Sequence, residues 1–470
     1  MIRTPAVLLL ASIFSISAMA QTSAKPSACD AAALNAPGIN VDDATDANAP
    51  MVYQAAIAQL LEAEDFKALD CIANEARTSK ARMTGGMWKI HMFYIGLAQP
   101  QGHATEEDWQ THFARLKRWM AVSPYSVTPL IAEADAYIAY ADEARGGDTA
   151  DTVTASGWRL FGERLQMAQD MVDRAAKNPA KDPELLLAQI GIAWSQGWEK
   201  PHMALLVKSA TKFEPSYYYY YRIYATYLLP KWDGEEGDTQ KFMTQIANQL
   251  GGDEGDIAYF QIAVSQLCHC GGDQDSVKTI SWPRVQRGFA AQEKRSGPSL
   301  YNMNQVAFMA VMSQDYLFAD KQFQRIGDQW VAEIWHDHNW FVSMKKSAAE
   351  IAPTLAANQS EANESEANAK TPEGVRYHDA VQQAMNAIVM ECAAADSSDL
   401  GPFTVNLAIG TDGKLANMNT PSTTKMFGCV MKKMWEAEKT EKPRLPKAPK
   451  PAYWVKIDLD PQALVSVQGK

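Results

Sequence analysis

A tyrosine-rich segment places the strongest constraint on the fold of this chain. Residues 216–234 read SYYYYYRIYATYLLPKWDG. Helical spacing aligns one apolar stripe, formed by Tyr217, Tyr220, Tyr221, Tyr224 and Leu228. The other tyrosines put aromatic bulk on further faces of the same helix. We therefore predict a helix that neighbouring helices cover on more than one side.

The flanking sequence predicts further helices joined by short turns. Apolar periodicity indicates helices at residues 183–193, 202–210 and 239–250. Pro183 and Pro215 stand at equivalent helix starts, 32 residues apart (215 − 183). This interval is close to the roughly 34 residues of a tetratricopeptide helical hairpin. We predict a mainly α fold with a tetratricopeptide-like α-solenoid, in which helical hairpins stack on one another.

The same helical character extends over residues 51–350. The last helix predicted in this region spans residues 318–345 and carries Trp330, Trp335 and Trp340. Glycine pairs and prolines separate the helical segments, and no segment before residue 400 shows the alternation of a strand. We predict that residues 51–350 form an all-α helical-repeat domain.

The N-terminus has the pattern of a secretory signal peptide. Arg3 precedes an apolar run at residues 6–16, and Ala18-Met19-Ala20 matches an A-x-A cleavage site. We predict that residues 1–20 are removed by cleavage after Ala20 and that residues 21–50 form an irregular leader. No later run reaches the ~20 apolar residues of a membrane span. We therefore expect a periplasmic or secreted protein without a membrane span.

The chain is acidic, with a formal net charge of −11. Removal of the signal peptide takes away Arg3 and makes the charge one unit more negative. An acidic exported protein has no general attraction to nucleic acid or to anionic lipid. The basic cluster at residues 439–450 is interleaved with prolines and is too short to reverse this balance. We expect no nucleic-acid partner.

Six cysteines remain after cleavage, and an even number in an oxidising compartment indicates disulfides. Fifteen pairings are formally possible for six cysteines. We favour the three pairs that each stay within one predicted structural unit, namely Cys29–Cys71, Cys268–Cys270 and Cys392–Cys429. Cysteines separated by one residue make a strained ring, so Cys268 and Cys270 are alternatively two free thiols.

The last part of the chain predicts a linker and a second domain. Residues 351–372 contain few large apolar residues and repeat Ser-Glu-Ala-Asn, which indicates a solvated linker that is helical in part. In residues 373–470, apolar alternation predicts strands at 403–409 and 453–459, with helices at 375–393 and 422–438. Ser422 is the predicted cap of the second helix. We predict a small α+β domain.

Two stretches resemble known families. Residues 60–345 resemble the bacterial family called domain of unknown function 4034, which implies a tetratricopeptide-type solenoid and no particular chemistry. The residues that carry this resemblance are Gly86-Met87-Trp88, Phe93-Tyr94, Trp109, Trp119, Pro124, Tyr140, Arg145-Gly146, and Leu229 to Gly234.

The tail, at residues 401–459, resembles the C-terminal domain of TonB-type energy transducers and related gliding proteins. The matching features are the strand at 403–409, Asp412-Gly413-Lys414, Cys429-Val430, the prolines after residue 442, and Tyr453-Trp454-Val455. Those transducers keep an uncleaved membrane anchor, whereas this N-terminus carries a cleavage site. The resemblance therefore implies a protein-contact role.

Two short clusters resemble metal sites. His336 and His338 would point about 200° apart on a helix, whereas helical zinc ligands are spaced i, i+4. Cys268-His269-Cys270 would need a fourth ligand from elsewhere in the chain. We expect no metal or other cofactor and no catalytic residue.

The sequence favours an exported, non-enzymatic interaction protein or scaffold that binds a protein or peptide in the cell envelope. The solenoid groove and the TonB-like tail would supply the contacts. Within the groove, we predict that Tyr220, Tyr224 and Trp232 contact the partner. The alternative is a metal-dependent periplasmic enzyme of unknown substrate.

Overall fold

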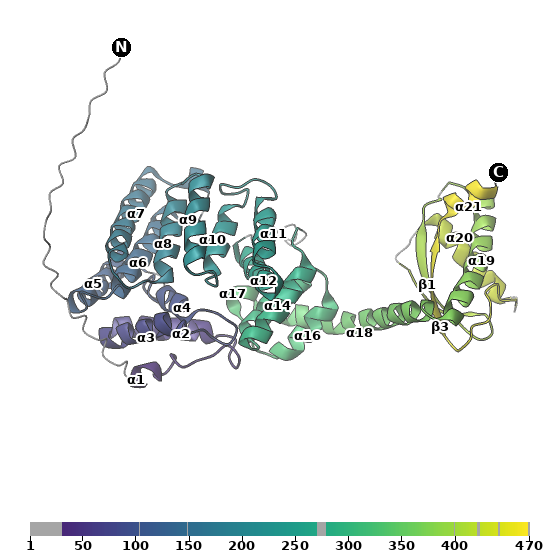
Figure 1. The fold of residues 1–470 in the computed structure, drawn as a ribbon, viewed down its shortest axis with the longest axis horizontal. Helices are drawn as coiled ribbons and strands as arrows, with labels where there is room; N and C mark the ends of the chain where they lie inside the picture. The colour runs from purple at the N-terminus through teal and green to yellow at the C-terminus, as the bar shows by residue number, and fades with distance from the viewer. Residues whose placement is uncertain are drawn as a thin grey trace, which may run out of the picture. The chain divides into compact units, whose positions relative to one another are not determined.

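The structure is a computed structural model that describes residues 31–102, 104–147, 149–269, 279–398, 400–420, 424–439 and 442–468. The chain is mainly helical, with one small antiparallel sheet near the C-terminus (Figure 1). It divides into two compact units. Unit 1 comprises residues 1–43 and 48–227, and unit 2 comprises residues 44–47 and 228–470. The predicted signal peptide lies outside the described residues.

Unit 1 is built from helices that pack against their neighbours in sequence, and α7 to α10 stand side by side in Figure 1. Ser, Thr and Asp side chains accept hydrogen bonds from the first turns of several helices, as at Asp65 before α3 and Asp182 before α8. The helices are α1 (Ala31–Leu34), α2 (Ala49–Glu62), α3 (Phe66–Ser79), α4 (Lys89–Ile95), α5 (Glu106–Val122), α6 (Thr128–Arg145), α7 (Ala155–Ala176), α8 (Pro183–Ser195), α9 (Lys200–Phe213) and α10 (Tyr219–Tyr227).

The tyrosine-rich helix begins later than its sequence suggests. Pro215 does not start it, because the Glu214 carboxylate accepts a hydrogen bond from the Ser216 hydroxyl (2.7 Å) and holds a turn there. The helix α10 then starts at Tyr219. Its tyrosines are buried on several faces, so the predicted coverage on more than one side is confirmed.

The helical part of unit 2 is more broken than predicted. The stretch at 318–345 forms parts of three helices, because the chain takes a positive φ of 62° at Gly327 and of 60° at His336. The helices are α11 (Asp238–Leu250), α12 (Gly252–His269), α14 (Trp282–Ser296), α15 (Leu300–Met312), α16 (Tyr316–Ile326), α17 (Ala332–Trp335), α18 (His338–Ala369), α19 (Pro372–Ala395), α20 (Lys425–Lys439) and α21 (Pro461–Gln468).

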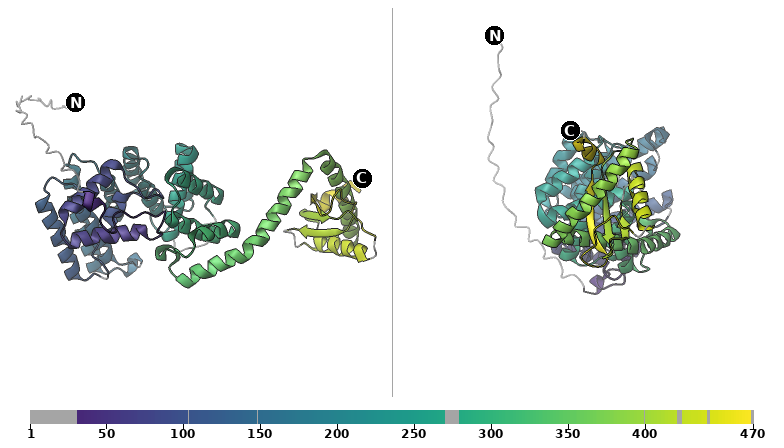
Figure 2. Two further views of the ribbon diagram at one scale, coloured as in Figure 1. Left: turned by 90° about the horizontal axis from the view of Figure 1, so that it is seen from below. Right: turned by 90° about the vertical axis from the view of Figure 1, so that its right-hand side faces the viewer.

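The predicted linker is helical almost throughout. The left view of Figure 2 shows α18 as one long helix, which continues through Pro353 to Ala369. The Ala and Glu residues of the segment have high helix propensity, which extends the predicted partial helix over nearly all of it. Its last turns contact the sheet, where the Asn417 side chain donates to Glu361 (3.2 Å) and the Asn368 side chain donates to the Trp454 carbonyl (3.0 Å).

The sheet has the strand order β2-β1-β3, and both pairings are antiparallel. The strands are β1 (Phe403–Ile409), β2 (Leu415–Asn419) and β3 (Tyr453–Leu459). The bounds of β1 and β3 confirm the two predicted strands. Their alternate apolar side chains join α19 and α20 in one core, centred on Leu407, Ile457, Val381 and Val430. Within the described ranges, no helix has the length and apolar character needed to cross a membrane.

Candidate functional site

The three residues predicted to contact a partner lie in different surroundings. Tyr220 has no exposed surface, and its hydroxyl donates to the Pro183 carbonyl (2.8 Å). Tyr224 is also buried and stacks on Tyr227. Trp232, in unit 2, is 42% exposed. A direct contact with a partner requires exposed surface, so Tyr220 and Tyr224 act as core residues of unit 1, and Trp232 alone of the three presents its ring to solvent.

A charged network lies in the interior of unit 1. The Arg77 guanidinium donates from Nε to Asp182 (2.6 Å) and from Nη2 to the Thr128 hydroxyl (2.8 Å). The Tyr94 hydroxyl donates to the same oxygen of Asp182 (2.8 Å). The Asp182 side chain also accepts from the Glu184 N–H (2.9 Å), which caps α8. The buried Arg77–Asp182 pair therefore ties together four helices of unit 1, α3, α4, α6 and α8.

A second group of polar side chains adjoins this network. His91 Nδ1 lies 3.0 Å from the Glu184 carboxyl, which also accepts a hydrogen bond from the Tyr217 hydroxyl. Burial lowers the pKa of His91 to about 3 and raises the pKa of Glu184 well above its ordinary value. Both effects favour the neutral forms of the two groups. The arrangement is a hydrogen-bonded core contact between α4, α8 and the chain before α10.

Asp135 is the member of this cluster with an unsatisfied hydrogen-bonding atom. Its buried Oδ2 has no hydrogen-bond partner among the described residues. Burial, together with the nearby Glu184 and Asp182, raises the pKa of Asp135 well above its ordinary value. Because the folded pKa is higher, the folded state holds its proton at pH values where the unfolded state has lost it. The contribution of Asp135 to the free energy of unfolding is therefore fully present below the unfolded pKa of about 3.9, and it is lost as the pH rises through the folded pKa.

We expect the substitution Asp135→Asn to stabilise unit 1 by about 1–3 kcal/mol at pH 7. The variant removes the cost of ionising a buried carboxyl. At pH 3.5 the two proteins should be of similar stability, because Asp135 is then protonated in both states. Denaturant unfolding at both pH values would measure this. The exposed Asp170→Asn serves as the control, and an equal effect of Asp135→Asn at both pH values would contradict the expectation.

The predicted metal candidates do not form a cluster among the described residues. His336 caps the end of α17 with a positive φ of 60°, whereas His338 is the first residue of α18 and packs its ring against Trp330. The side chains of Cys268 and His269, and all of Cys270, lie outside the described residues. In the described part of the chain, no group of three or more His, Cys, Asp or Glu side chains is placed to hold a metal ion.

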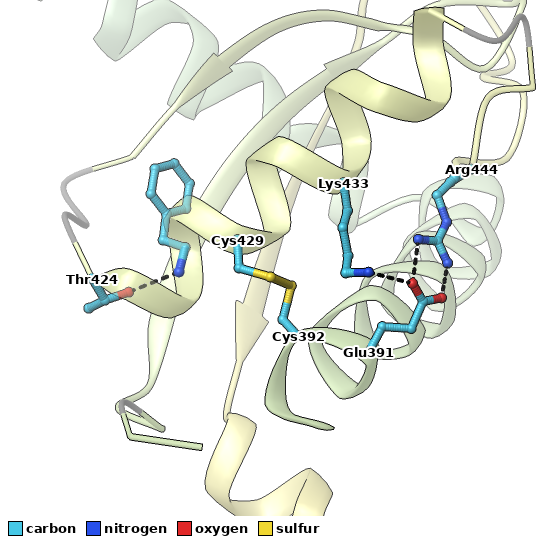
Figure 3. The surroundings of a disulfide bond; sticks show 7 residues. Glu391, Cys392, Thr424, Cys429, Lys433 and Arg444 are labelled. Carbon is cyan, nitrogen blue, oxygen red and sulfur yellow. Dashed lines mark hydrogen bonds and ion pairs between the residues drawn. A yellow bond between two sulfur atoms is a disulfide. The ribbon is translucent and has the colours of Figure 1, made fainter. Parts of the chain in front are cut away.

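One predicted disulfide is confirmed. Cys392 of α19 and Cys429 of α20 are bonded, with their Cα atoms 6.0 Å apart (Figure 3). Cys71 is also disulfide-bonded, while its predicted partner Cys29 lies outside the described residues.

The Cys392–Cys429 bond is flanked by an ion-pair cluster. In Figure 3, Glu391 lies between Arg444 and Lys433, and the hydrogen bonds from Arg444 and then Lys433 lower its pKa to about 2. Thr424 caps α20 by accepting from the Phe427 N–H (3.1 Å). The predicted cap, Ser422, lies outside the described residues. Together, these contacts join α19, α20 and the proline-rich segment that leads into β3.

β3 is one of the two edge strands of the sheet, and side chains of α18 and α19 cover part of its outer edge. In an antiparallel pair, alternate residues direct both N–H and C=O away from the neighbouring strand. The Trp454 carbonyl accepts from Asn368 (3.0 Å), and the Asp458 carbonyl accepts from the Gln382 side chain (3.0 Å). These bonds place residues 454, 456 and 458 in the outward set. Thr404 pairs with Asp458 across β1 and β3, and its carbonyl points away from β3 to accept from the Thr420 hydroxyl. This direction agrees with the outward direction of the Asp458 backbone.

Lys456 is the middle residue of this edge. Its outward N–H and C=O make no hydrogen bond with any residue that the structure describes. Its side chain is exposed, as is that of Asp458. The edge therefore offers the Lys456 N–H as a donor and the Lys456 carbonyl as an acceptor. The carbonyls on either side, of Trp454 and Asp458, already accept from side-chain amides. The strand itself was predictable from its alternation, whereas Asn368 and Gln382 gave no signal because they are distant in sequence.

No family model, no curated protein and no solved structure matches this chain.

Proposed function

We propose that this chain is an exported, non-enzymatic interaction protein of the cell envelope, periplasmic or secreted after cleavage near Ala20. Its helical hairpins would form a tetratricopeptide-like solenoid, and its tail would act as a TonB-like binding domain. The observation that carries the proposal is the outward backbone of Lys456 on the edge strand β3. A partner would bind there as an extended segment that adds a strand to the sheet.

Three features of the tail support this proposal. The sheet has only three strands, so a partner strand beside β3 would add backbone hydrogen bonds to a small structure. The Cys392–Cys429 disulfide and the Glu391 ion pairs hold the packed helices in place, which reduces the ordering cost of binding. The Asn368 and Gln382 side chains each donate to one β3 carbonyl, and a partner strand would replace these two hydrogen bonds with backbone ones. Exposed Lys456 would favour an acidic residue opposite it.

We expect Lys456→Pro to abolish capture of such a partner while Lys456→Ala preserves it. Proline removes the outward N–H, yet edge strands tolerate proline where the N–H does not pair within the sheet. The test is crosslinking and pull-down from envelope fractions with the mature chain and both variants. A protein recovered with wild type and Lys456→Ala but lost with Lys456→Pro supports the proposal.

Two controls keep this test interpretable. Circular dichroism and an intact Cys392–Cys429 bond would establish that Lys456→Pro is folded. A version of the chain that ends at Ala369 removes the sheet altogether and should also lose the partner. Equal recovery by the wild type and the proline variant would refute strand addition, and recovery by the truncated chain would place the contact on the helical region instead.

A further inference from the structure

A polar, open cavity lies at the surface of unit 1, on residues that the proposed tail interaction does not use. It has a volume of about 340 Å³ and lies among the end of α2, the loop after α4 and the first half of α5. This volume falls at the lower end of the roughly 300–1,000 Å³ typical of small-molecule sites. Most of its lining side chains are polar or charged. A ligand of this cavity should therefore be small and polar.

Two opposite charges line the cavity without pairing. Arg115 of α5 is half-buried, and it makes no hydrogen bond or ion pair with any described residue. Glu62 at the end of α2 is exposed, and it likewise has no such partner in the described chain. The Asp108 carboxylate differs, because it accepts from the Thr105 N–H (2.8 Å) and hydroxyl (2.7 Å) in a capping box. Arg115 and Glu62 are thus the charges available to a ligand.

His112 contributes a neutral group to the same cavity. Its Nε2 lies 2.9 Å from the Leu97 carbonyl, and a carbonyl can only accept, so Nε2 carries the hydrogen. Burial lowers the pKa of His112 to about 4, and the ring is neutral at pH 7. Arg115 is therefore the only cation among the lining residues that the structure describes. Thr111 and Gln99 add uncharged hydrogen-bonding groups.

Apart from Gln101, the remaining lining is apolar. It includes Ala58, Leu61 and Pro100, together with Gly96. A Cβ at Gly96 would lie 2.6 Å from the Gln54 carbonyl oxygen, so α4 approaches α2 this closely only with glycine there. The apolar surface can accept a short aliphatic side chain but offers no large hydrophobic pocket.

We propose that this cavity binds a small zwitterion, namely a free α-amino acid or a short peptide with a small aliphatic side chain. Arg115 would bind the carboxylate and Glu62 the ammonium group. A guanidinium can donate two parallel hydrogen bonds to a carboxylate. A ligand with both charges satisfies both residues, whereas a simple anion or cation leaves one of them without a partner.

Calorimetric titration of the mature chain would test this proposal. The zwitterionic probes are L-alanine and L-alanyl-L-alanine, and the singly charged probes are propionate and ethylamine. We expect at least one zwitterion to bind about tenfold or more tightly than either singly charged probe. Binding of alanine alone identifies an amino-acid site, and preference for the dipeptide identifies a peptide site. Either result supports the proposal.

Matched variants locate the binding. Arg115→Gln and Glu62→Gln should each weaken binding by about tenfold or more, and neither residue makes a hydrogen bond or ion pair with a residue that the structure describes. Arg118→Gln is the control, because Arg118 lies on the same helix but pairs with exposed Glu64 outside the cavity. The proposal is overturned if the wild type binds neither zwitterion, if propionate binds equally well, or if Arg115→Gln and Arg118→Gln behave alike.

Discussion

Replacing Arg77 with Met should lower the free energy of unfolding of unit 1 by about 3–5 kcal/mol. The substitution keeps an unbranched apolar side chain in place but removes the cation beside Asp182, whose side chain is fully buried. The Asp182 carboxylate would then retain only the Tyr94 hydroxyl and the Glu184 N–H as donors. The loss of stability comes mainly from leaving this charge in the interior without its counterion. Amide hydrogen exchange in α3 and α8 would measure it.

Two further variants separate this cause from a general loss of packing. In Arg77→Met with Asp182→Asn, no charge remains, and asparagine can still cap α8, so we expect much of the lost stability to return. Arg159→Met breaks an exposed ion pair with Glu163 and should change stability by less than about 1 kcal/mol. If Arg77→Met cost no more than Arg159→Met, the network would be of little importance to stability.

Removal of the Cys392–Cys429 disulfide should destabilise the tail by about 3–4 kcal/mol. The bond closes a loop with a sequence separation of 37 residues, and it joins the two helices that cover the sheet. Without it, the unfolded tail has more conformational freedom, which lowers the free energy of unfolding. The variant is Cys392→Ala with Cys429→Ala in the full chain, and the measurement is hydrogen exchange in β1 and β3.

A reductant alone would be ambiguous, because Cys71 is also disulfide-bonded. The double-alanine variant keeps that bond, so exchange in α2 and α3 should match the wild type. Adding reductant should then accelerate exchange in α3 but not further in β1. Unchanged protection of β1 in the variant would show that packing of α19 and α20 alone holds the tail together.

Local patterns in the sequence determined much of the fold. Alternating apolar residues placed β1 and β3 at their observed bounds, since a half-buried strand requires a period of two. Helical periodicity identified the helical region, and the confinement of Cys392 and Cys429 to one small unit identified their bond. Each of these signals depends on residues that are close in sequence or confined to one short segment.

Other features depend on contacts between distant residues, which no local pattern contains. The tyrosines of α10 look alike in sequence, and only the packing of α10 against α8 and α9 buries Tyr220 and Tyr224. Asn368 and Gln382 meet the edge of β3 from two separate helices.

The cavity and the charged interior of unit 1 also required the tertiary structure. Glu62 and Arg115 line one cavity although 53 residues separate them (115 − 62), and Arg77 pairs with Asp182 over a separation of 105. Charged residues in a sequence are usually read as exposed, because burial of an unpaired charge is costly. Whether such a residue lies in solvent, in the core or beside a cavity is decided only when folding brings its partner close or leaves it without one.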